Sequence, residues 1–240
     1  MKYTEVMGVS LVNGSIEEAV EKALRITEEH RSAYVVAPDS EMMIAARKNE
    51  NYMRTIQEAE LRLPEGNGVM YAAGILGNPL KCRISALDFV SALMARMAEK
   101  NMSVFILGRD YDIVETAGLN IQNRYLGLRL AGTDDGYFDN ELELLDLINQ
   151  AKPDLLLVGY GSPEQEKWMN RNKNQLDVGL MVGFGDELPV VAGSAERAPK
   201  RWRDSGFEWF YWLMKDPKRF GRMVKRTNIV FTAAWRRLVG

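Results

Sequence analysis

The chain has 240 residues, 46% hydrophobic and 27% charged, with a formal net charge of -2. This composition excludes a disordered chain, and the single cysteine, Cys82, excludes an internal disulfide. Its apolar runs are strand-sized, far short of the roughly 20 residues that span a bilayer, and no signal-peptide pattern opens the chain. We therefore expect a cytoplasmic protein that meets a membrane only at its surface.

Short strand-like runs alternate with helical patterns, which is typical of an α/β fold with a doubly wound, mainly parallel, Rossmann-like sheet. Ser15 and Glu18 form a capping box at the start of the first helix, and His30 near its end is expected to be structural. Further helices are predicted at 41–59 in two stretches, 67–76, 86–99, 111–124, 140–151 and 163–172. Strands are predicted at 33–37, 61–63, 103–107, 128–132, 155–158 and 178–182.

In such sheets the ligand lies beyond the carboxyl ends of the strands. The site is therefore expected in the loops that begin at Ala37, Pro64, Gly108, Gly159 and Gly183.

The segment from Gly159 to Trp168 is the most informative of these loops. Its glycines let a ligand approach the backbone, Ser162 is expected to cap the next helix, Pro163 suits a first helical position and Gln165 completes a capping box. Free amides at this helix start could hold a diphosphate. The alternative is that these residues only build a strand-to-helix turn.

Two other loops carry chemical groups. Glu65, in Leu63-Pro-Glu-Gly-Asn-Gly68, places a carboxylate on a glycine-rich turn where it could act as a general base, or simply be an exposed turn acid. Arg83 offers planar donors for a phosphate or carboxylate, or is a solvated loop cation.

Taken together, these segments resemble the WecG/TagA/CpsF family of bacterial glycosyltransferases over nearly the whole chain. The motifs that carry the resemblance are Pro-Glu-Gly-Asn-Gly68, Leu87-Asp88, Gly136-Tyr-Phe138, Gly161-Ser-Pro-Glu-Gln-Glu-Lys-Trp168, Ala192-Gly193, Arg197-Ala-Pro199, Glu208-Trp-Phe-Tyr211 and Asp216-Pro-Lys-Arg219. The resemblance implies metal-independent, inverting transfer of N-acetylmannosamine, or a related sugar, from a UDP-sugar to a polyprenyl-diphosphate-linked N-acetylglucosamine, with no cofactor. Such reactions build teichoic acid linkages, enterobacterial antigen and capsules.

The resemblance also implies roles for residues. Glu65 falls on the position of the base, and Arg83, Gln165, Arg219 and Arg222 fall on functional positions. Glu65 and Arg83 are the expected catalytic residues. The other positions expected to bind substrate are Ala37, Asp39, Asn67, Gly68, Ser85, Asp88, Gly108, Gly161, Glu166, Gly185, Asp186, Arg197 and Trp212.

The chain departs from the family's usual residues inside these motifs. It has Ala37-Pro-Asp39 for Thr-Pro-Asn, Glu65 for aspartate, Ser85-Ala-Leu-Asp88 for Gly-x-Asp, Gly185-Asp-Glu-Leu-Pro189 for Gly-Gly-Ser-Phe-Asp, and Trp212 for an arginine. Asp186 and Glu187 would repel a diphosphate unless they point away. Three interpretations stay open: a relative with another donor or acceptor, a relative that binds without catalysing, and a scaffold whose pocket has been rebuilt.

The last part of the chain has the opposite charge to the rest. Residues 196–240 carry 12 basic and four acidic residues, a net charge of +8, whereas residues 1–195 carry -10. We therefore divide the chain into an α/β domain, 1–195, and a basic, aromatic, helical appendage, 196–240. A run at 207–213, nearly all aromatic or aliphatic, precedes Arg219, Arg222, Lys225 and Arg226. This pattern suits an interfacial helix on an anionic surface at the inner face of the cell membrane.

Two alternatives concern this appendage. Its aromatic residues could cover the α/β core while its arginines are solvated, or the appendage alone could make the chain a peripheral membrane adaptor. No nucleic-acid motif accompanies the charge, so nucleic acid is not an expected partner. A homo-oligomer is compatible with the sequence.

Overall fold

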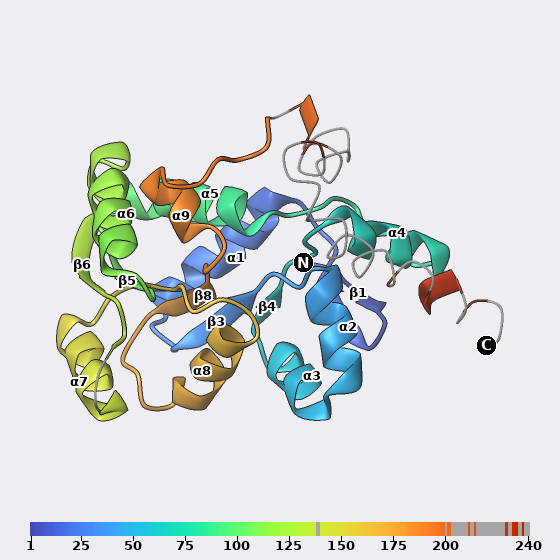
Figure 1. Cartoon of the computed structure of the whole chain (residues 1–240), viewed down its shortest axis with the longest axis horizontal. Coiled ribbons are helices and arrows are strands. Elements are labelled where there is room, and N and C mark those ends of the chain that lie inside the picture. The colour runs from blue at the N-terminus through green and yellow to red at the C-terminus, as the bar shows by residue number, and fades with distance from the viewer. Residues whose placement is uncertain are drawn as a thin grey trace.

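The computed structural model describes residues 1–137, 140–199, 201–202, 211, 214, 229, 232–234 and 237. Its centre is a parallel sheet in the order β4-β3-β8-β7-β5-β6 (Figure 1). The bounds of these strands are β3 Ala33–Val36, β4 Leu61–Arg62, β5 Ser103–Leu107, β6 Arg129–Asp134, β7 Leu155–Val158 and β8 Leu180–Gly183. The predicted doubly wound α/β class is confirmed.

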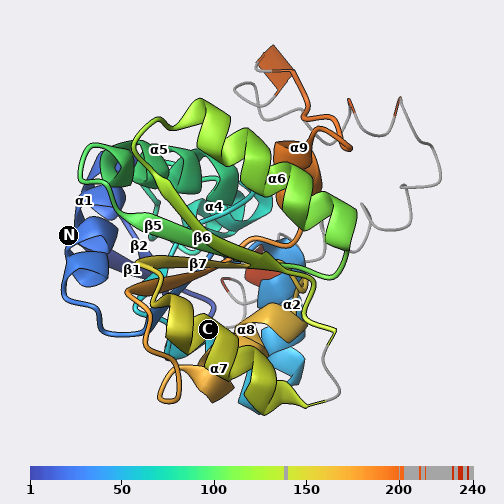
Figure 2. The same cartoon turned by 90° about the vertical axis from the view of Figure 1, so that its left-hand side faces the viewer.

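Helices cover both faces of this sheet, and strand side chains alternate between the two layers. In β5, Phe105 and Leu107 pack on one side, whereas Val104 and Ile106 pack on the other. Figure 2 shows α5, α6 and α9 on one face of the sheet and α7 and α8 on the opposite face. The four residues of β7 and of β8 are all buried, as expected for central parallel strands.

The helices follow the predicted order closely. Their bounds are α1 Ile16–Glu28, α2 Ser40–Lys48, α3 Glu50–Gln57, α4 Asn67–Ile75, α5 Ala86–Ala98, α6 Tyr111–Arg124, α7 Glu141–Ala151, α8 Glu164–Asn172 and α9 Leu188–Ala192. The capping box is present at α1: the Glu18 amide donates to Ser15 Oγ, and the Ser15 amide donates to Glu18 Oε2. His30 lies just beyond this helix and pairs with Asp177 at 3.1 Å, which fits its predicted structural role.

A hairpin before α1 was not predicted. Strands β1 Tyr3–Val6 and β2 Val9–Val12 pair antiparallel around a turn at Met7 and Gly8, whose φ angles are 53° and 89°. Gln57 and Arg62 tie the hairpin to the domain, because their side chains donate to the carbonyls of Gly8 and Ser10. A Met-Gly pair predicts a hairpin turn only weakly, compared with the Asn-Gly or Asp-Gly pairs that are usual in such turns.

Some residues of the C-terminal segment pack on the α/β core. Ile229 and Ala233 are fully buried, in the same hydrophobic cluster as Val69 of α4. Arg237 donates to the Ile75 carbonyl at 2.7 Å. The cationic group from Arg219 to Arg226 lies outside the described residues. Across the helices that are described, none is long and apolar enough to cross a bilayer.

Candidate active site

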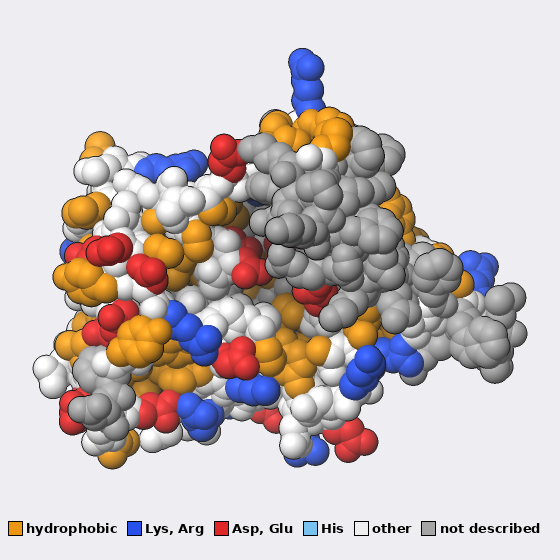
Figure 3. All heavy atoms as spheres, in the orientation of Figure 1, with side chains coloured by type: hydrophobic (Ala, Val, Ile, Leu, Met, Phe, Trp, Pro, Cys, Tyr) orange, Lys and Arg blue, Asp and Glu red, His pale blue; other side chains and the backbone are white. Residues whose placement is uncertain are grey.

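The carboxyl ends of β3, β4 and β8 meet at one edge of the sheet, as predicted for its loops. Asp39 follows β3, Glu65 follows β4, and Glu187 follows β8. The charges of Glu187 and Asp39 reach Glu65, so folding brings together three carboxylates that are distant in sequence. Figure 3 shows that acidic side chains reach the surface near the middle of the face in view.

The Glu65 carboxylate is strongly perturbed by this environment. Burial, followed by the negative charges of Glu187 and Asp39, raises its pKa well above the ordinary value, and the Ala86 amide and the Arg83 cation oppose the rise. The amide of Ala86 donates to Glu65 Oε1 at 3.1 Å, at the first residue of α5. Ser85, at the N-cap position, makes no side-chain hydrogen bond that caps this helix. The Glu65 carboxylate accepts from the helix start in its place. The contact fixes the carboxylate at the helix start.

Glu187 is the second perturbed carboxyl. Burial, with a further contribution from the charge of Asp186, raises the pKa of Glu187 to about 7, while the Arg197 cation opposes the rise. Asp186 itself is exposed. Glu187 is therefore about half protonated near neutral pH, and the negative charge around Glu65 changes in that range.

Several predicted substrate residues have structural contacts here. Asp39 Oδ1 accepts from the Met42 amide at 2.9 Å and caps α2. Gly68 permits close packing of α4 on α2, because a Cβ there would lie 2.2 Å from Ser40 Oγ. Asn67 is the first residue of α4, and Ala37 packs on the core.

Arg197 forms a fork with Asp88. Its two terminal nitrogens lie 2.8 Å from the two carboxylate oxygens, and one also donates to Ser85 Oγ at 3.3 Å. Arg197 thus bonds to two other predicted site residues, Ser85 and Asp88. The Arg197–Asp88 pair links the segment after α9 to the start of α5, close to Glu65. In this structure Arg197 therefore holds together two segments that border the candidate site.

Gln165 joins two loops. Its Oε1 accepts from the amides of Gly161 at 3.1 Å and Gly185 at 3.0 Å. The predicted capping box is wrong: α8 has no side-chain cap at Pro163, and the Ser162 hydroxyl donates instead to Glu166 Oε1. The Gly161 amide is occupied rather than free.

We expect Gly185→Ala to lower the free energy of unfolding by about 1–3 kcal/mol. A Cβ there would lie 2.5 Å from the Gly161 nitrogen and 2.9 Å from Gln165 Oε1, forcing the loops apart. Urea denaturation measures the change. The matched control is Gly74→Ala, in α4, where a Cβ meets nothing within 4 Å; it should stabilise by about 0.5–1 kcal/mol. Equal effects of the two variants would show that the Gly185 contact is unimportant.

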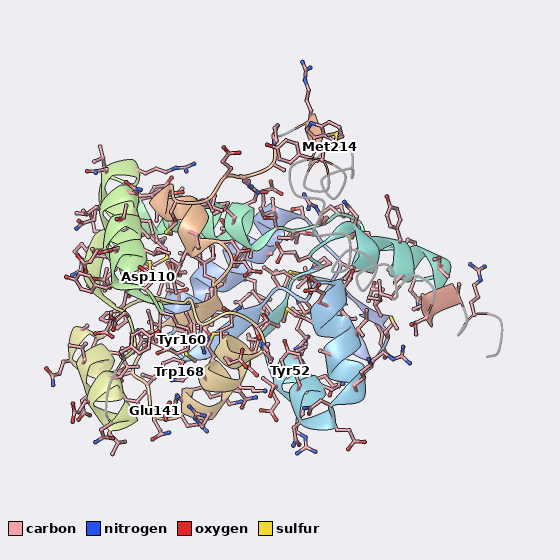
Figure 4. All side chains as sticks on the ribbon, in the orientation of Figure 1. Tyr52, Asp110, Glu141, Tyr160, Trp168 and Met214 are labelled. Atoms are coloured by element: carbon pink, nitrogen blue, oxygen red, sulfur yellow. The ribbon has the colours of Figure 1, made fainter. Side chains whose placement is uncertain are left out.

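A cavity of 460 Å³ lies beside the loop that follows β7. It is lined by residues that follow β5, β6 and β7 and by residues of α7 and α8: Arg109, Asp135, Gly136, Tyr137, Glu141, Leu144, Tyr160, Glu164, Lys167, Trp168 and Arg171. The Arg109 guanidinium lies 5.4 Å from the Tyr160 ring centre, and Trp168 meets Tyr160 edge-on at 5.8 Å. Figure 4 shows Trp168 and Tyr52 on opposite sides of α8.

The cavity and the perturbed carboxylates do not coincide, since no predicted site residue lines the cavity. We take the carboxylates as the candidate site, because a carboxylate whose pKa is raised can serve as a proton acceptor. Connections leave β5 and β7 towards opposite faces, so the cavity lies at a topological switch point, where ligands bind in such sheets. The sequence predicted that the loops beginning at Gly108 and Gly159 border a site, but it did not single out Arg109 or Tyr160 as residues of that site.

Other predicted residues fall elsewhere. A Cβ on Gly108 would lie 2.3 Å from Val114, so this glycine allows α6 to pack on the sheet. Trp212, Arg219 and Arg222 lie outside the described residues. Among the residues that are described, no group of three or more His, Cys, Asp or Glu side chains is arranged to hold a metal ion.

Tyr52, whose hydroxyl contacts Glu166, was not predicted as a site residue. The sequence shows it only as an aromatic residue on an apolar helix face.

Comparison with known proteins gives consistent matches. Residues 4–240 match the model of the glycosyl transferase WecG/TagA/CpsF family. An N-acetylglucosaminyldiphosphoundecaprenol N-acetyl-beta-D-mannosaminyltransferase of Staphylococcus aureus strain MW2 is 31% identical over 222 residues, 91% of this chain and 87% of the relative. The protein of the same description from Bacillus spizizenii strain W23 is 28% identical over 197 residues, 82% of this chain and 77% of the relative.

Proposed function

Since the chain belongs to the WecG/TagA/CpsF family of glycosyl transferases, we propose that it moves N-acetylmannosamine from a UDP-sugar to N-acetylglucosamine on a polyprenyl diphosphate. The names of the relatives supply the acceptor and the transferred sugar. The UDP donor and a mechanism without a metal are part of the proposal. The product would be an intermediate of teichoic acid or another cell-wall polymer.

The observation that carries this proposal is the perturbed Glu65 carboxylate at the edge of the sheet. Its raised pKa makes it a better proton acceptor than an ordinary carboxylate once ionised, and the Ala86 amide orients it. Glu65 takes the proton of the acceptor hydroxyl while the new bond forms to the anomeric carbon. The hydroxyl attacks the face opposite UDP, and the electron pair of the broken bond leaves with UDP, so this single displacement inverts the configuration.

Negative charge develops on the diphosphate as it leaves, and cations or backbone amides must stabilise this charge. Arg83 supplies a cation whose charge reaches Glu65, and we propose that Arg219 and Arg222 approach from the appendage. The carboxylates of Asp39 and Glu187 act against this stabilisation, because they add negative charge around Glu65, where the diphosphate of the donor would bind. Partial protonation of Glu187 near neutral pH reduces that repulsion.

The acceptor is carried on a lipid, so we propose that the protein works at the inner membrane face. The test is to supply UDP-N-acetylmannosamine with the polyprenyl-diphosphate acceptor in anionic vesicles, and to measure UDP release and product configuration. UDP release with an inverted product is the expected result. If neither UDP release nor calorimetric UDP binding is found, the proposal fails and a non-catalytic or rebuilt member of the fold is favoured.

A further inference from the structure

Glu166, in the first turn of α8, carries one of the few buried charged side chains among the residues described. Only 1% of its surface is exposed. A buried carboxylate is costly unless hydrogen bonds satisfy it. The residue therefore needs a structural explanation that the sugar-transfer chemistry does not supply.

Three donors surround this carboxylate. Ser162 Oγ and Gln165 Nε2 donate to Glu166 Oε1 at 2.9 and 2.8 Å. The hydroxyl of Tyr52, from α3, donates to Oε2 at 3.1 Å. Burial raises the pKa of Glu166, and the three donors act against that rise.

Glu166 determines which way the Gln165 amide faces. An ionised carboxylate only accepts, so it takes the NH₂ side of the amide. The amide oxygen of Gln165 must then face the other way, towards the backbone amides of Gly161 and Gly185 at 3.1 and 3.0 Å. If the amide turned over, its NH₂ group would meet two N–H donors.

This orientation holds the loops after β7 and β8 together. The fit is close, because a Cβ on Gly183 would lie 2.7 Å from Gln165 Nε2 and one on Gly185 would lie 2.5 Å from the Gly161 nitrogen. Asp186 and Glu187 come directly after Gly185, and the charge of Glu187 reaches Glu65. The loop that Gln165 contacts therefore leads directly to a carboxylate of the candidate site.

We propose that Glu166 and Tyr52 are positioning residues, which orient the Gln165 amide so that it clamps Gly161 to Gly185 and sets the spacing of the loops after β7 and β8 beside Glu65. The clamp itself stands on the contacts above. Only its kinetic consequence rests on the proposed function.

The first test measures hydrogen exchange in peptides that cover residues 159–165 and 183–187. Glu166→Met removes the acceptor but keeps an unbranched side chain, so exchange of the Gly161 and Gly185 amides should rise about tenfold or more, with other β7 and β8 amides unchanged. Glu166→Gln should restore most of the protection, because its amide oxygen accepts from Gln165 while its NH₂ group meets the Tyr52 oxygen. Equal exchange in the Met and Gln variants would overturn the proposal.

A second pair of variants keeps the test valid if Glu166→Met unfolds. Tyr52→Phe should raise exchange at the same two amides by a smaller factor. Tyr34→Phe is the matched control, since Tyr34 is as buried and its hydroxyl bonds to Thr55 and Asn170 rather than to Glu166. A similar change at Gly161 and Gly185 in both variants, or none in Tyr52→Phe, would contradict the clamp.

Kinetics separates the clamp from the proposed function. If the wild type transfers sugar, Glu166→Met should raise the donor KM about tenfold with the acceptor KM unchanged, and Glu166→Gln should rescue it. A wild type without transfer activity refutes the proposed function and leaves the exchange result to decide the clamp. An unchanged donor KM in Glu166→Met would refute the proposed link between loop spacing and donor binding.

Discussion

Glu65→Gln is expected to lower kcat for sugar transfer by about a thousandfold, the scale of a lost general base. The amide is nearly isosteric and its oxygen can still accept from the Ala86 amide, the contact that Glu65 Oε1 makes now. Folding should therefore be preserved while the ability to take a proton is lost. Steady-state UDP release measures the loss of kcat, and circular dichroism measures whether the fold is preserved.

Two further variants control this result. Glu50→Gln removes an exposed carboxylate at the start of α3 and should leave kcat unchanged. Glu65→Asp keeps a base but shortens the side chain by a methylene, so part of the activity should remain. If Glu65→Gln stays within about threefold of the wild type, another group takes the proton.

Glu187→Gln should raise the free energy of unfolding by about 1–3 kcal/mol at pH 8, while changing it little at pH 4.5 or below. Folding raises the pKa of this carboxyl from 4.5 to about 7, chiefly by burial and secondarily by the charge of Asp186. The folded state thus favours the protonated form. Its stabilising contribution is complete below pH 4.5 and is lost as the pH rises to about 7. The neutral glutamine has no such loss.

Urea unfolding of both proteins across this pH range measures the effect. In an Asp186→Asn background the gain at pH 8 should shrink, because removing that negative charge lowers the pKa of Glu187. A gain that is the same at pH 4.5 and pH 8 would mean that packing, rather than ionisation, is responsible. Glu187→Gln should also lower the pKa of Glu65, and so shift the acid side of the pH–rate profile to lower pH.

Local sequence was sufficient for most secondary structure. The bounds of β5, β7 and α6 agree with their predictions because short apolar runs and caps such as Asp110 are local signals. The five-residue helix α9 was missed, since Pro189 lies in its only turn and no periodic pattern develops. At α8, the Ser162 hydroxyl bonds to Glu166 instead of capping, a competition that sequence spacing does not reveal.

By itself the sequence determined the α/β class, and it indicated the loops of the candidate site and Glu65 and Arg83 as the groups to inspect. Each of these follows from local patterning or from motifs. Tertiary structure decided the strand order, the contact of Glu65 with Ala86, and the charges of Asp39 and Glu187 beside it. It also paired Arg197 with Asp88 and made Gln165 a clamp. These depend on which strand ends become neighbours, which is set by packing the whole sheet; burial and charge at that edge then set the proton affinity of Glu65.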